Sequence, residues 1–332
     1  MAADLWWLGV VIPGVVVAII ALSFIVTKLT APGFKVDGKQ VFITGGSTGL
    51  GLSVAKKYAA AGAKVSIVAR GVANLEAAKA EIEAVSKHKT PVFMQSCDVT
   101  NFESVQDAVN AANKFHGRAT DHLICSAGVS HPGYFLDTDV SVFHKMMDLN
   151  YFGTLHAIKA ALPAMVSQDA GGQIVLVSSG LALTSWIGYS QYSGSKYATR
   201  GLADSLRNEL LAYNIRVSIY YPGNIDSPGY VEEEKTKPEE TKTIEGISEL
   251  THPDAVAQSL INGISDGEFS ITNEVMIFFL RTIANGVAPR YNSMLEMVLL
   301  PIIVLIQIGF GFFMDFTVKQ AAKKKAKKNK KE

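Results

Sequence analysis

A tyrosine and a lysine four residues apart carry the clearest chemistry in this sequence. Tyr192 and Lys196 lie in the run Tyr-Ser-Gly-Ser-Lys, within a segment over 190–212 whose pattern predicts a helix. Residues four apart share one face of a helix, so the phenol and the ammonium would lie side by side. The ordinary pKa of a tyrosine is about 10, and a neighbouring cation lowers that value. The pair predicts proton exchange with a substrate, whereas a surface pair on an amphipathic helix is the alternative.

Two serines precede this pair at the end of an apolar run. Ile174-Val-Leu-Val is followed by Ser178 and Ser179, a pattern that predicts a buried strand ending in hydroxyl groups. A hydroxyl group there could bind a carbonyl oxygen while the tyrosine protonates it. Ser179 is the predicted substrate-orienting residue. Ser178 stays open as the alternative, because the sequence does not fix where the strand ends.

A glycine-rich turn near the beginning of the chain predicts a nucleotide site. The β-branched run 40–44 leads into Gly45-Gly-Ser-Thr-Gly-Leu-Gly, and a helical pattern follows over 52–61. In a strand, glycine-rich turn and helix, the backbone can approach a pyrophosphate, which binds at the helix N-terminus. A glycine turn that binds nothing is the alternative, which the tyrosine–lysine pair disfavours. The predicted cofactor-binding residues of the turn are Gly45, Ser47, Thr48, Gly49 and Gly51.

Together, the glycine turn and the tyrosine–lysine pair resemble the motifs of the short-chain dehydrogenase/reductases, from about residue 39 to about residue 269. The resemblance implies a Rossmann-type, doubly wound parallel sheet and transfer of a hydride between a nicotinamide cofactor and a carbonyl carbon. It implies that Tyr192 donates the proton to the carbonyl oxygen and that Ser179 stabilises the growing negative charge. It further implies that Lys196 lowers the pKa of the tyrosine and that Asn150 holds a water of the proton relay.

The same resemblance implies several contacts with the cofactor. Asp98 and Val99 would meet the adenine, Ile225 would contact the carboxamide through its backbone, and Tyr192 and Lys196 would contact the nicotinamide ribose. One departure is visible, since the Asn-Asn-Ala-Gly run of the family reads Cys-Ser-Ala-Gly here. That segment supports the central sheet, so the departure concerns geometry rather than chemistry.

The end of the second expected strand indicates which dinucleotide is used. Enzymes that use NAD usually place an acidic side chain about 20 residues beyond the glycine turn. No Asp or Glu occurs between Lys64 and Ala73, and Arg70 occupies this neighbourhood. A guanidinium suits a 2′-phosphate, with Ser47 and Thr48 as additional hydroxyl donors. The sequence therefore predicts NADPH, whereas an ordinary solvated arginine is the alternative.

Length and patterning predict one large α/β domain with additional terminal segments. The chain has 332 residues, enough for a catalytic core of some 230 residues. Apolar β-type runs alternate with helical stretches, which indicates βαβ units and a parallel sheet covered on both faces. Cys97 and Cys125 end two such runs and are predicted to be buried, reduced thiols, with no metal site. The expected strands lie near 40–44, 64–69, 92–95, 122–126, 173–178, 215–220 and 269–272.

The N-terminal segment predicts a membrane anchor. Leu5 to Val26 is uncharged and would span about 33 Å as a helix, enough to cross a bilayer. A cleaved signal peptide is the alternative, but a basic region before the apolar stretch is missing. Lysines follow the span while Asp4 precedes it, so the positive-inside tendency places the catalytic domain in the cytosol.

The C-terminal segment predicts a second membrane association. Met294 to Phe316 is largely apolar, and the tail that follows over 319–332 carries a net charge of +7. A single crossing would place these lysines on the far side, against the positive-inside rule. A hairpin bent at Pro301 with both ends cytosolic is therefore expected, and a buried dimerisation segment is the alternative. The last five residues resemble the dilysine retrieval signal of the endoplasmic reticulum, so the chain is predicted to lie in that membrane.

The segment over 226–250 is predicted to be the substrate lid. It contains Thr236-Lys-Pro-Glu-Glu-Thr241, which resembles a run in one group of the family, the 3-ketodihydrosphingosine reductases. The resemblance implies NADPH-dependent reduction of 3-ketodihydrosphingosine, a long-chain sphingoid ketone taken from the bilayer, in sphingolipid synthesis. It also implies a homodimer, while nucleic-acid binding is not expected.

Two alternatives to this function stay open. One is a membrane-bound steroid or 3-ketoacyl-CoA reductase of the same family. The other is a catalytically inactive membrane scaffold, which the complete set of catalytic residues disfavours. The expected divisions of the chain are an anchor over 1–28, a catalytic domain over 36–273, a membrane-associated segment over 274–318 and a lysine-rich tail over 319–332.

Overall fold

The computed structural model describes residues 11–246 and 248–329, and its centre is a parallel sheet of seven strands. The strand order β3-β2-β1-β4-β5-β6-β7 is that of a doubly wound Rossmann-type sheet, which confirms the predicted fold class. Each expected strand is present within about two residues of its expected bounds. The strands are β1 Gln40–Thr44, β2 Lys64–Ala69, β3 Phe93–Ser96, β4 His122–Cys125, β5 Gly172–Val177, β6 Ile215–Tyr221 and β7 Ser270–Thr272.

Two hydrophobic layers cover the faces of the sheet. Neighbouring residues of a strand point to opposite faces, so Val41 and Ile43 of β1 pack into one layer and Phe42 into the other. All five residues of β1 are buried, as expected for a central strand of a parallel sheet. One layer contains α3 Gly49–Ala60, α4 Val72–Val85 and α11 Pro253–Asp266. The other contains α5 Phe102–His116, α7 Gly153–Ser167 and α8 Ser190–Glu209.

Shorter helices and turns lie between these main elements. The helix expected over 190–212 is α8 followed by one tight turn, η4. The remaining short elements are α6 Val140–Met146, the π-helical turn η2 Met147–Phe152, η3 Gly180–Ala182, η4 Leu210–Tyr213, α9 Pro228–Glu234, α10 Glu239–Glu245 and α12 Val275–Ala284.

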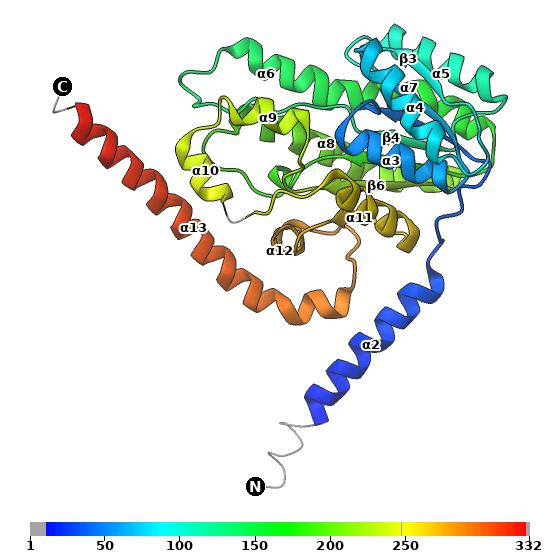
Figure 1. The fold of residues 1–332 in the computed structure, drawn as a ribbon. Coiled ribbons are helices and arrows are strands. Elements are labelled where there is room, and N and C mark those ends of the chain that lie inside the picture. Colours follow the sequence, from blue (N-terminus) through cyan, green and yellow to red (C-terminus); the bar gives the residue numbers. More distant parts are fainter. Residues whose placement is uncertain (1–10, 247, 330–332) are drawn as a thin grey trace.

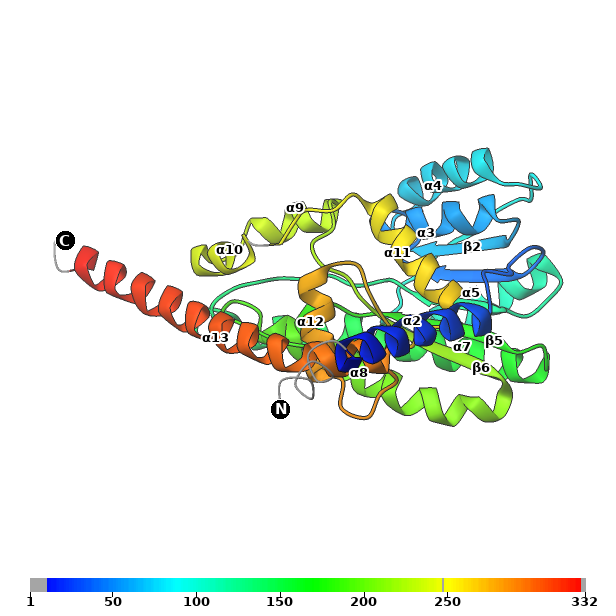
Figure 2. The ribbon, with the colours of Figure 1, turned by 90° about the horizontal axis from the view of Figure 1, so that it is seen from below.

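Two apolar helices project from the domain in different directions (Figures 1 and 2). They are α2, Ile12–Thr30, and α13, Ser293–Asn329, and each is long and apolar enough to cross a membrane. The beginning of the expected anchor lies outside the described residues, as do the last three residues of the expected retrieval signal. The expected reversal at Pro301 is wrong, because the helix continues through this proline.

The two apolar helices are joined where they leave the domain. Ser23 of α2 exchanges hydrogen bonds of 3.0 and 2.8 Å with the side chain of Asn292, the residue before α13. The ring of Phe24 meets Tyr291 edge-on, with 5.8 Å between centroids. Lys28 pairs with Asp266 at the end of α11, at 2.5 Å. α2 therefore contacts both the α/β domain and the segment that leads into α13.

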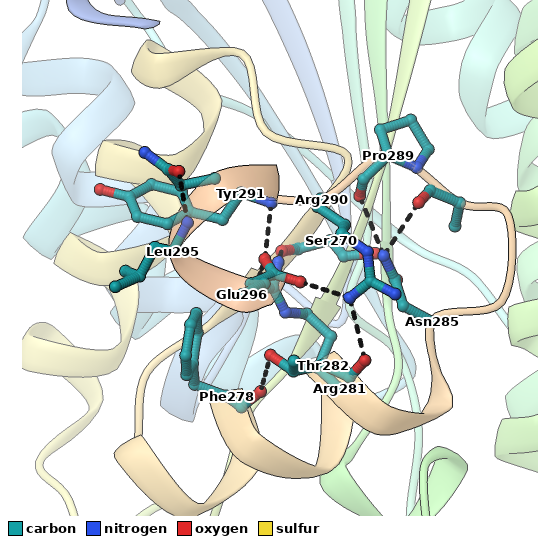
Figure 3. A network of polar contacts seen from close by, with 12 residues as sticks. Ser270, Phe278, Arg281, Thr282, Asn285, Pro289, Arg290, Tyr291, Leu295 and Glu296 are labelled. Atoms are coloured by element: carbon teal, nitrogen blue, oxygen red, sulfur yellow. Dashed lines mark hydrogen bonds and ion pairs between the residues drawn. The ribbon is translucent and has the colours of Figure 1, made fainter. Parts of the chain in front are cut away.

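A buried ion-pair network fixes the first turn of α13 (Figure 3). Glu296, which interrupts the apolar pattern, is fully buried and accepts from Arg281 at 2.5 Å and from Arg290 at 2.8 Å. The backbone amide of Tyr291 donates to the same carboxylate, and Arg281 also donates to the carbonyl oxygen of Ser270 in β7. A buried carboxylate requires such partners. This network therefore sets the direction in which α13 leaves the sheet.

Candidate active site

Three of the four predicted catalytic residues, Ser179, Tyr192 and Lys196, line one pocket together with the glycine turn, at the carboxyl ends of β1, β4, β5 and β6. In open parallel sheets of this kind, ligands bind outside these strand ends. The loops after the four strands form one side, over 45–51, 126–130, 178–181 and 222–225. The predicted residues that line the pocket are Gly45, Ser47, Thr48, Gly49, Gly51, Ser178, Ser179, Tyr192, Lys196 and Ile225.

The glycine turn is shaped as a dinucleotide requires. Gly45 has a φ of +68°, and a Cβ there would lie 2.9 Å from the backbone of Ala127. A Cβ on Gly51 would overlap the carbonyl oxygen of Gly45, so only glycine lets α3 begin this close to the turn. The N-terminus of α3 thus faces the pocket with its free amide groups, a suitable site for a pyrophosphate. The residues present fit the nicotinamide dinucleotide that the motif implies.

The structure distinguishes the two candidate serines. Ser179 makes a side-chain hydrogen bond with Tyr192, and its Oγ accepts from the amide of Leu181 at 3.2 Å. Ser178 is buried and donates to the carbonyl oxygen of Lys196 at 3.2 Å, which commits its hydroxyl to the backbone of α8. Ser179 is the serine whose hydroxyl lies beside the phenol of Tyr192.

Lys196 lies beneath the ring of Tyr192. Its Nζ is 5.6 Å from the ring centroid and donates to the carbonyl oxygen of Val177 at 3.1 Å. Burial lowers the pKa of Lys196 to about 8. Burial also raises the pKa of Tyr192, the nearby Glu233 carboxylate raises it further, and the bond with Ser179 opposes the rise. Desolvation of the phenol dominates, so the pKa of Tyr192 is raised in this arrangement, and its expected lowering by the Lys196 charge stays a prediction.

Asn150 lies behind the pocket lining in the π-helical turn η2. Its Nδ2 donates to Val129 and Ser195 at 3.0 and 2.9 Å, and its Oδ1 accepts from the amide of Val129 at 3.0 Å. A Cβ on Gly128 would meet both Asn150 Oδ1 and Lys196 Nζ, at 3.0 and 3.4 Å. Asn150 and Lys196 therefore both lie close to Gly128. Three hydrogen bonds fix the side chain of Asn150.

The other predicted cofactor residues lie together at a second position, beyond the pocket lining. Arg70 is exposed at the end of β2, and Asp98 follows β3, its neighbour in the sheet. Hydrogen bonds from Thr100 and the Arg70 charge hold the pKa of Asp98 below its usual value. Val99 is buried against Gly153 of α7. This grouping at neighbouring strand ends is where the adenosine end of a dinucleotide bound at α3 would extend.

Residues from more distant segments complete the pocket, and the sequence patterns did not reveal them. Trp186 and Tyr189 come from the connection between β5 and α8, Glu233 from α9, and Phe310 from the apolar helix α13. The ring of Phe310 meets Trp186 edge-on, with 6.1 Å between centroids. An aromatic residue inside an apolar helix gives no signal of such a contact.

The expected lid forms two short helices, α9 and α10, around a buried lysine. Lys237 contacts Glu245 at 2.7 Å, Glu233 at 3.4 Å and Glu234 at shorter range. Thr241 of α10 donates to the carbonyl oxygen of Ile187 at 2.8 Å, which attaches the lid to the loop before α8. α10 also lies against α13. A segment whose composition indicates a solvated loop is thus folded over the pocket.

Comparison with known proteins places this site in a family. Residues 39–238 match the family model described as short chain dehydrogenase. A protein of Dictyostelium discoideum named 3-ketodihydrosphingosine reductase is 36% identical over 289 residues, which cover 83% of this chain and 86% of the relative. A protein of Danio rerio named 3-dehydrosphinganine reductase is 34% identical over 282 residues, which cover 84% of each chain.

Solved structures show the same architecture. A short-chain type dehydrogenase/reductase from Mycobacterium marinum is 29% identical with a TM-score of 0.65, over 72% of this chain and 95% of the other. A short chain dehydrogenase/reductase from Burkholderia phymatum, solved in complex with NAD, has a TM-score of 0.67 at 22% identity, over 75% of this chain and 93% of the other, and shows the fold alone. This chain belongs to the short-chain dehydrogenase/reductase family of nicotinamide-dependent oxidoreductases.

Proposed function

We propose that this chain is an NADPH-dependent reductase that converts 3-ketodihydrosphingosine to dihydrosphingosine in sphingolipid synthesis. The relatives from Dictyostelium discoideum and Danio rerio, which it matches over more than four-fifths of its length, bear names for this activity. The observation that carries the proposal is that the apolar helix α13 contributes Phe310 to the lining of the catalytic pocket. A helix suited to lipid thus reaches the reaction centre, which favours a long-chain lipid ketone.

The residues of the site have the following proposed roles in reduction. A nicotinamide cofactor supplies the hydride that the carbonyl carbon accepts. Tyr192 donates its phenolic proton to the carbonyl oxygen, and Ser179 donates a hydrogen bond to the same oxygen as negative charge develops there. Burial raises the pKa of Tyr192, so the phenol carries its proton before the carbonyl is reduced.

Lys196 and Asn150 support the proton transfer. Once Tyr192 has lost its proton, the Lys196 ammonium stabilises the phenolate above it across the 5.6 Å that separate Nζ from the ring centroid. Lys196 and Asn150 meet at Gly128, which is the proposed start of the path that returns a proton from solvent. Asn150 would hold a water there, since its side chain is fixed by three hydrogen bonds.

We propose NADPH rather than NADH because of the charges at the ends of β2 and β3. Arg70 is the cation at this position, and residues 64–73 offer no carboxylate for a ribose 2′-hydroxyl. The lowered pKa of Asp98 keeps its carboxylate charged near Arg70. This carboxylate would orient the Arg70 guanidinium and would not take over its role in binding the phosphate. Asp98 and Val99 would then bound the adenine, and Ile225 the carboxamide.

The proposed location is the endoplasmic reticulum membrane, with the catalytic domain in the cytosol. α2 would cross the bilayer, while α13 has Ile303 buried and Phe310 in the pocket, so that half of this helix lies within reach of the domain. In this position α13 would lie along the membrane surface, and the lysines at its C-terminal end would lie near anionic lipids on the cytosolic side. Protease digestion of an epitope placed after Glu332, in sealed microsomes, tests this orientation; protection of the epitope would contradict it.

Turnover of purified full-length enzyme on three ketones tests the proposed reaction. With NADPH in mixed micelles, 3-ketodihydrosphingosine should be reduced at least tenfold more efficiently than a steroid ketone or a 3-ketoacyl-CoA. Preference for either of the other ketones would assign the chain to another branch of the family. Absence of turnover on all three, with NADPH binding retained, would indicate a scaffold.

A further inference from the structure

Glu233 brings a carboxylate into the pocket on the side of the catalytic tyrosine. Its side chain is only 16% exposed and lines the same pocket as Tyr192. The hydroxyl of Tyr189 donates to its Oε1, and the Tyr189 ring lies 6.0 Å from that of Tyr192, centroid to centroid. After burial, the Glu233 charge is the strongest influence that raises the pKa of Tyr192. The carboxylate therefore lies close enough to act on the reaction centre.

The contacts of Glu233 leave negative charge at the pocket. Three carboxylates, Glu233, Glu234 and Glu245, surround the single ammonium of Lys237. Lys237 lies nearer to Glu234 and Glu245, while its distance to Glu233 is 3.4 Å. Both Tyr189 and Lys237 contact Oε1 of Glu233. Burial raises the pKa of Glu233, a cost that a second cation in the pocket would offset.

The substrate of the proposed function bears a cation at the matching place. Its primary amine is on the carbon next to the carbonyl carbon, so the nitrogen lies within a few ångströms of the oxygen that Tyr192 protonates. Steroid ketones and 3-ketoacyl thioesters have no amine there. We infer that Glu233 binds the ammonium group of a 2-amino ketone and so selects a sphingoid base over neutral lipid ketones. This inference rests on the proposed function and assigns substrate selection to Glu233.

A purely structural role for Glu233, in holding the lid through Lys237, would have a different signature. Loss of the lid affects every ketone that binds beneath it, whereas loss of an ammonium partner affects only ketones that bear the amine. The informative quantity is therefore the ratio of kcat/KM for two substrates that differ only in the amine, not the activity on one of them.

The experiment compares E233Q with the wild type on 3-ketodihydrosphingosine and on the 1-hydroxy-3-ketone of equal chain length that lacks the amine. Glutamine keeps the shape and a hydrogen-bond acceptor but removes the charge. The ratio of kcat/KM values, amine-bearing over amine-free, should fall at least about tenfold in E233Q, as expected for loss of a charge-assisted hydrogen bond. The matched control is E232Q, because Glu232 is 70% exposed and pairs with the exposed Lys235; its ratio should equal that of the wild type.

The outcomes separate the inference from the proposed function. If the wild type reduces the sphingoid ketone and E233Q leaves the ratio unchanged, the inference is overturned and the function stands. If the wild type does not reduce the sphingoid ketone, the function itself fails. Should E233Q not fold, inhibition of the wild type by octadecylamine and octadecanol decides: the amine should inhibit at least tenfold more strongly, and equal inhibition would overturn the inference.

Discussion

At the scale of single residues, the proposed chemistry depends on the phenol of Tyr192, which is half-buried and hydrogen-bonded to Ser179. Tyr192→Phe removes the proposed proton donor and keeps the ring that covers Lys196. We expect kcat to fall by at least about 100-fold, while the affinity for NADPH changes less than threefold. NADPH oxidation and tryptophan fluorescence titration measure the two quantities. Tyr197→Phe, on the exposed side of α8, is the control, and unaltered turnover in Tyr192→Phe would refute the role.

The charge of Arg70 is expected to decide between the two dinucleotides. Arg70→Glu places a carboxylate where a 2′-phosphate would lie and repels it, but it can accept from a 2′-hydroxyl. The kcat/KM for NADPH should fall at least tenfold, and that for NADH should stay equal or rise. Steady-state kinetics with both cofactors measures this change. Lys79→Glu, on the exposed face of α4, makes the same charge change elsewhere, and an equal effect there would show that Arg70 has no special role.

Burial of the Lys196 ammonium is expected to lower the free energy of unfolding in a pH-dependent way. Its pKa falls from 10.5 in the unfolded chain to about 8 in the fold, so the unfolded state binds more protons between these values. Stability attributable to Lys196 therefore rises as pH increases from 8 to 10.5, and the penalty is largest below pH 8. Lys196→Met should raise the free energy of unfolding at pH 7 by up to ~3 kcal/mol, with the gain shrinking by pH 10. Urea unfolding at several pH values tests this, and a gain independent of pH would contradict it.

The residues predicted from the sequence share one property: they belong to local motifs. The glycine turn and the Tyr192–Lys196 pair each lie within one strand–turn–helix unit or one helix, so their geometry follows from spacing. Trp186, Glu233 and Phe310 reach the pocket only because separate segments fold together over it. Long-range placement of this kind has no periodicity to reveal it.

At the scale of elements, the strands were predictable because a sheet covered on both faces requires continuous apolar runs. The two helices of the lid and the unbroken course of α13 were not predicted, although a lid over 226–250 and an apolar C-terminal segment were. The charged composition of 226–250 indicates a solvent-exposed loop. Lys237 is nevertheless buried, because neighbouring carboxylates compensate its charge. Pro301 suggests a reversal, yet a proline removes only one hydrogen bond of the helix and leaves α13 continuous.

The buried lysine of the lid gives the prediction at this scale. Lys237→Met removes the cation that three neighbouring carboxylates share. Removing one partner of a buried ion pair leaves an uncompensated charge, which strongly destabilises the fold around it. We expect α9 and α10 to detach, so that proteolysis within 226–250 accelerates and the KM for the lipid ketone rises, while NADPH affinity is kept. Lys235→Met is the control, since Lys235 is 60% exposed and pairs with Glu232. Resistance of Lys237→Met to proteolysis would show that the lid is held by other contacts.

At the scale of the whole molecule, the catalytic domain and its apolar helices form one connected body. α2 joins α13 through Ser23 and Asn292, and Glu296 fixes α13 to the sheet, so Phe310 is positioned by contacts far from the pocket (Figure 3). The homodimer that the family resemblance implies stays a prediction.

The position of Phe310 predicts that its effect on KM depends on the chain length of the substrate. Its ring against Trp186 is proposed to guide the alkyl chain of the substrate from the lipid surface along α13 to Tyr192. Phe310→Ala should raise the KM for the long-chain ketone at least fivefold, since about 150 Å² of aromatic surface is lost from the path. A water-soluble short-chain amino ketone should be reduced equally by both proteins, because it does not use this path. Phe312→Ala, 72% exposed two residues away, is the matched control for membrane binding. If Phe310→Ala changes both substrates alike, α13 supports the pocket without delivering the lipid, and the route of entry lies elsewhere.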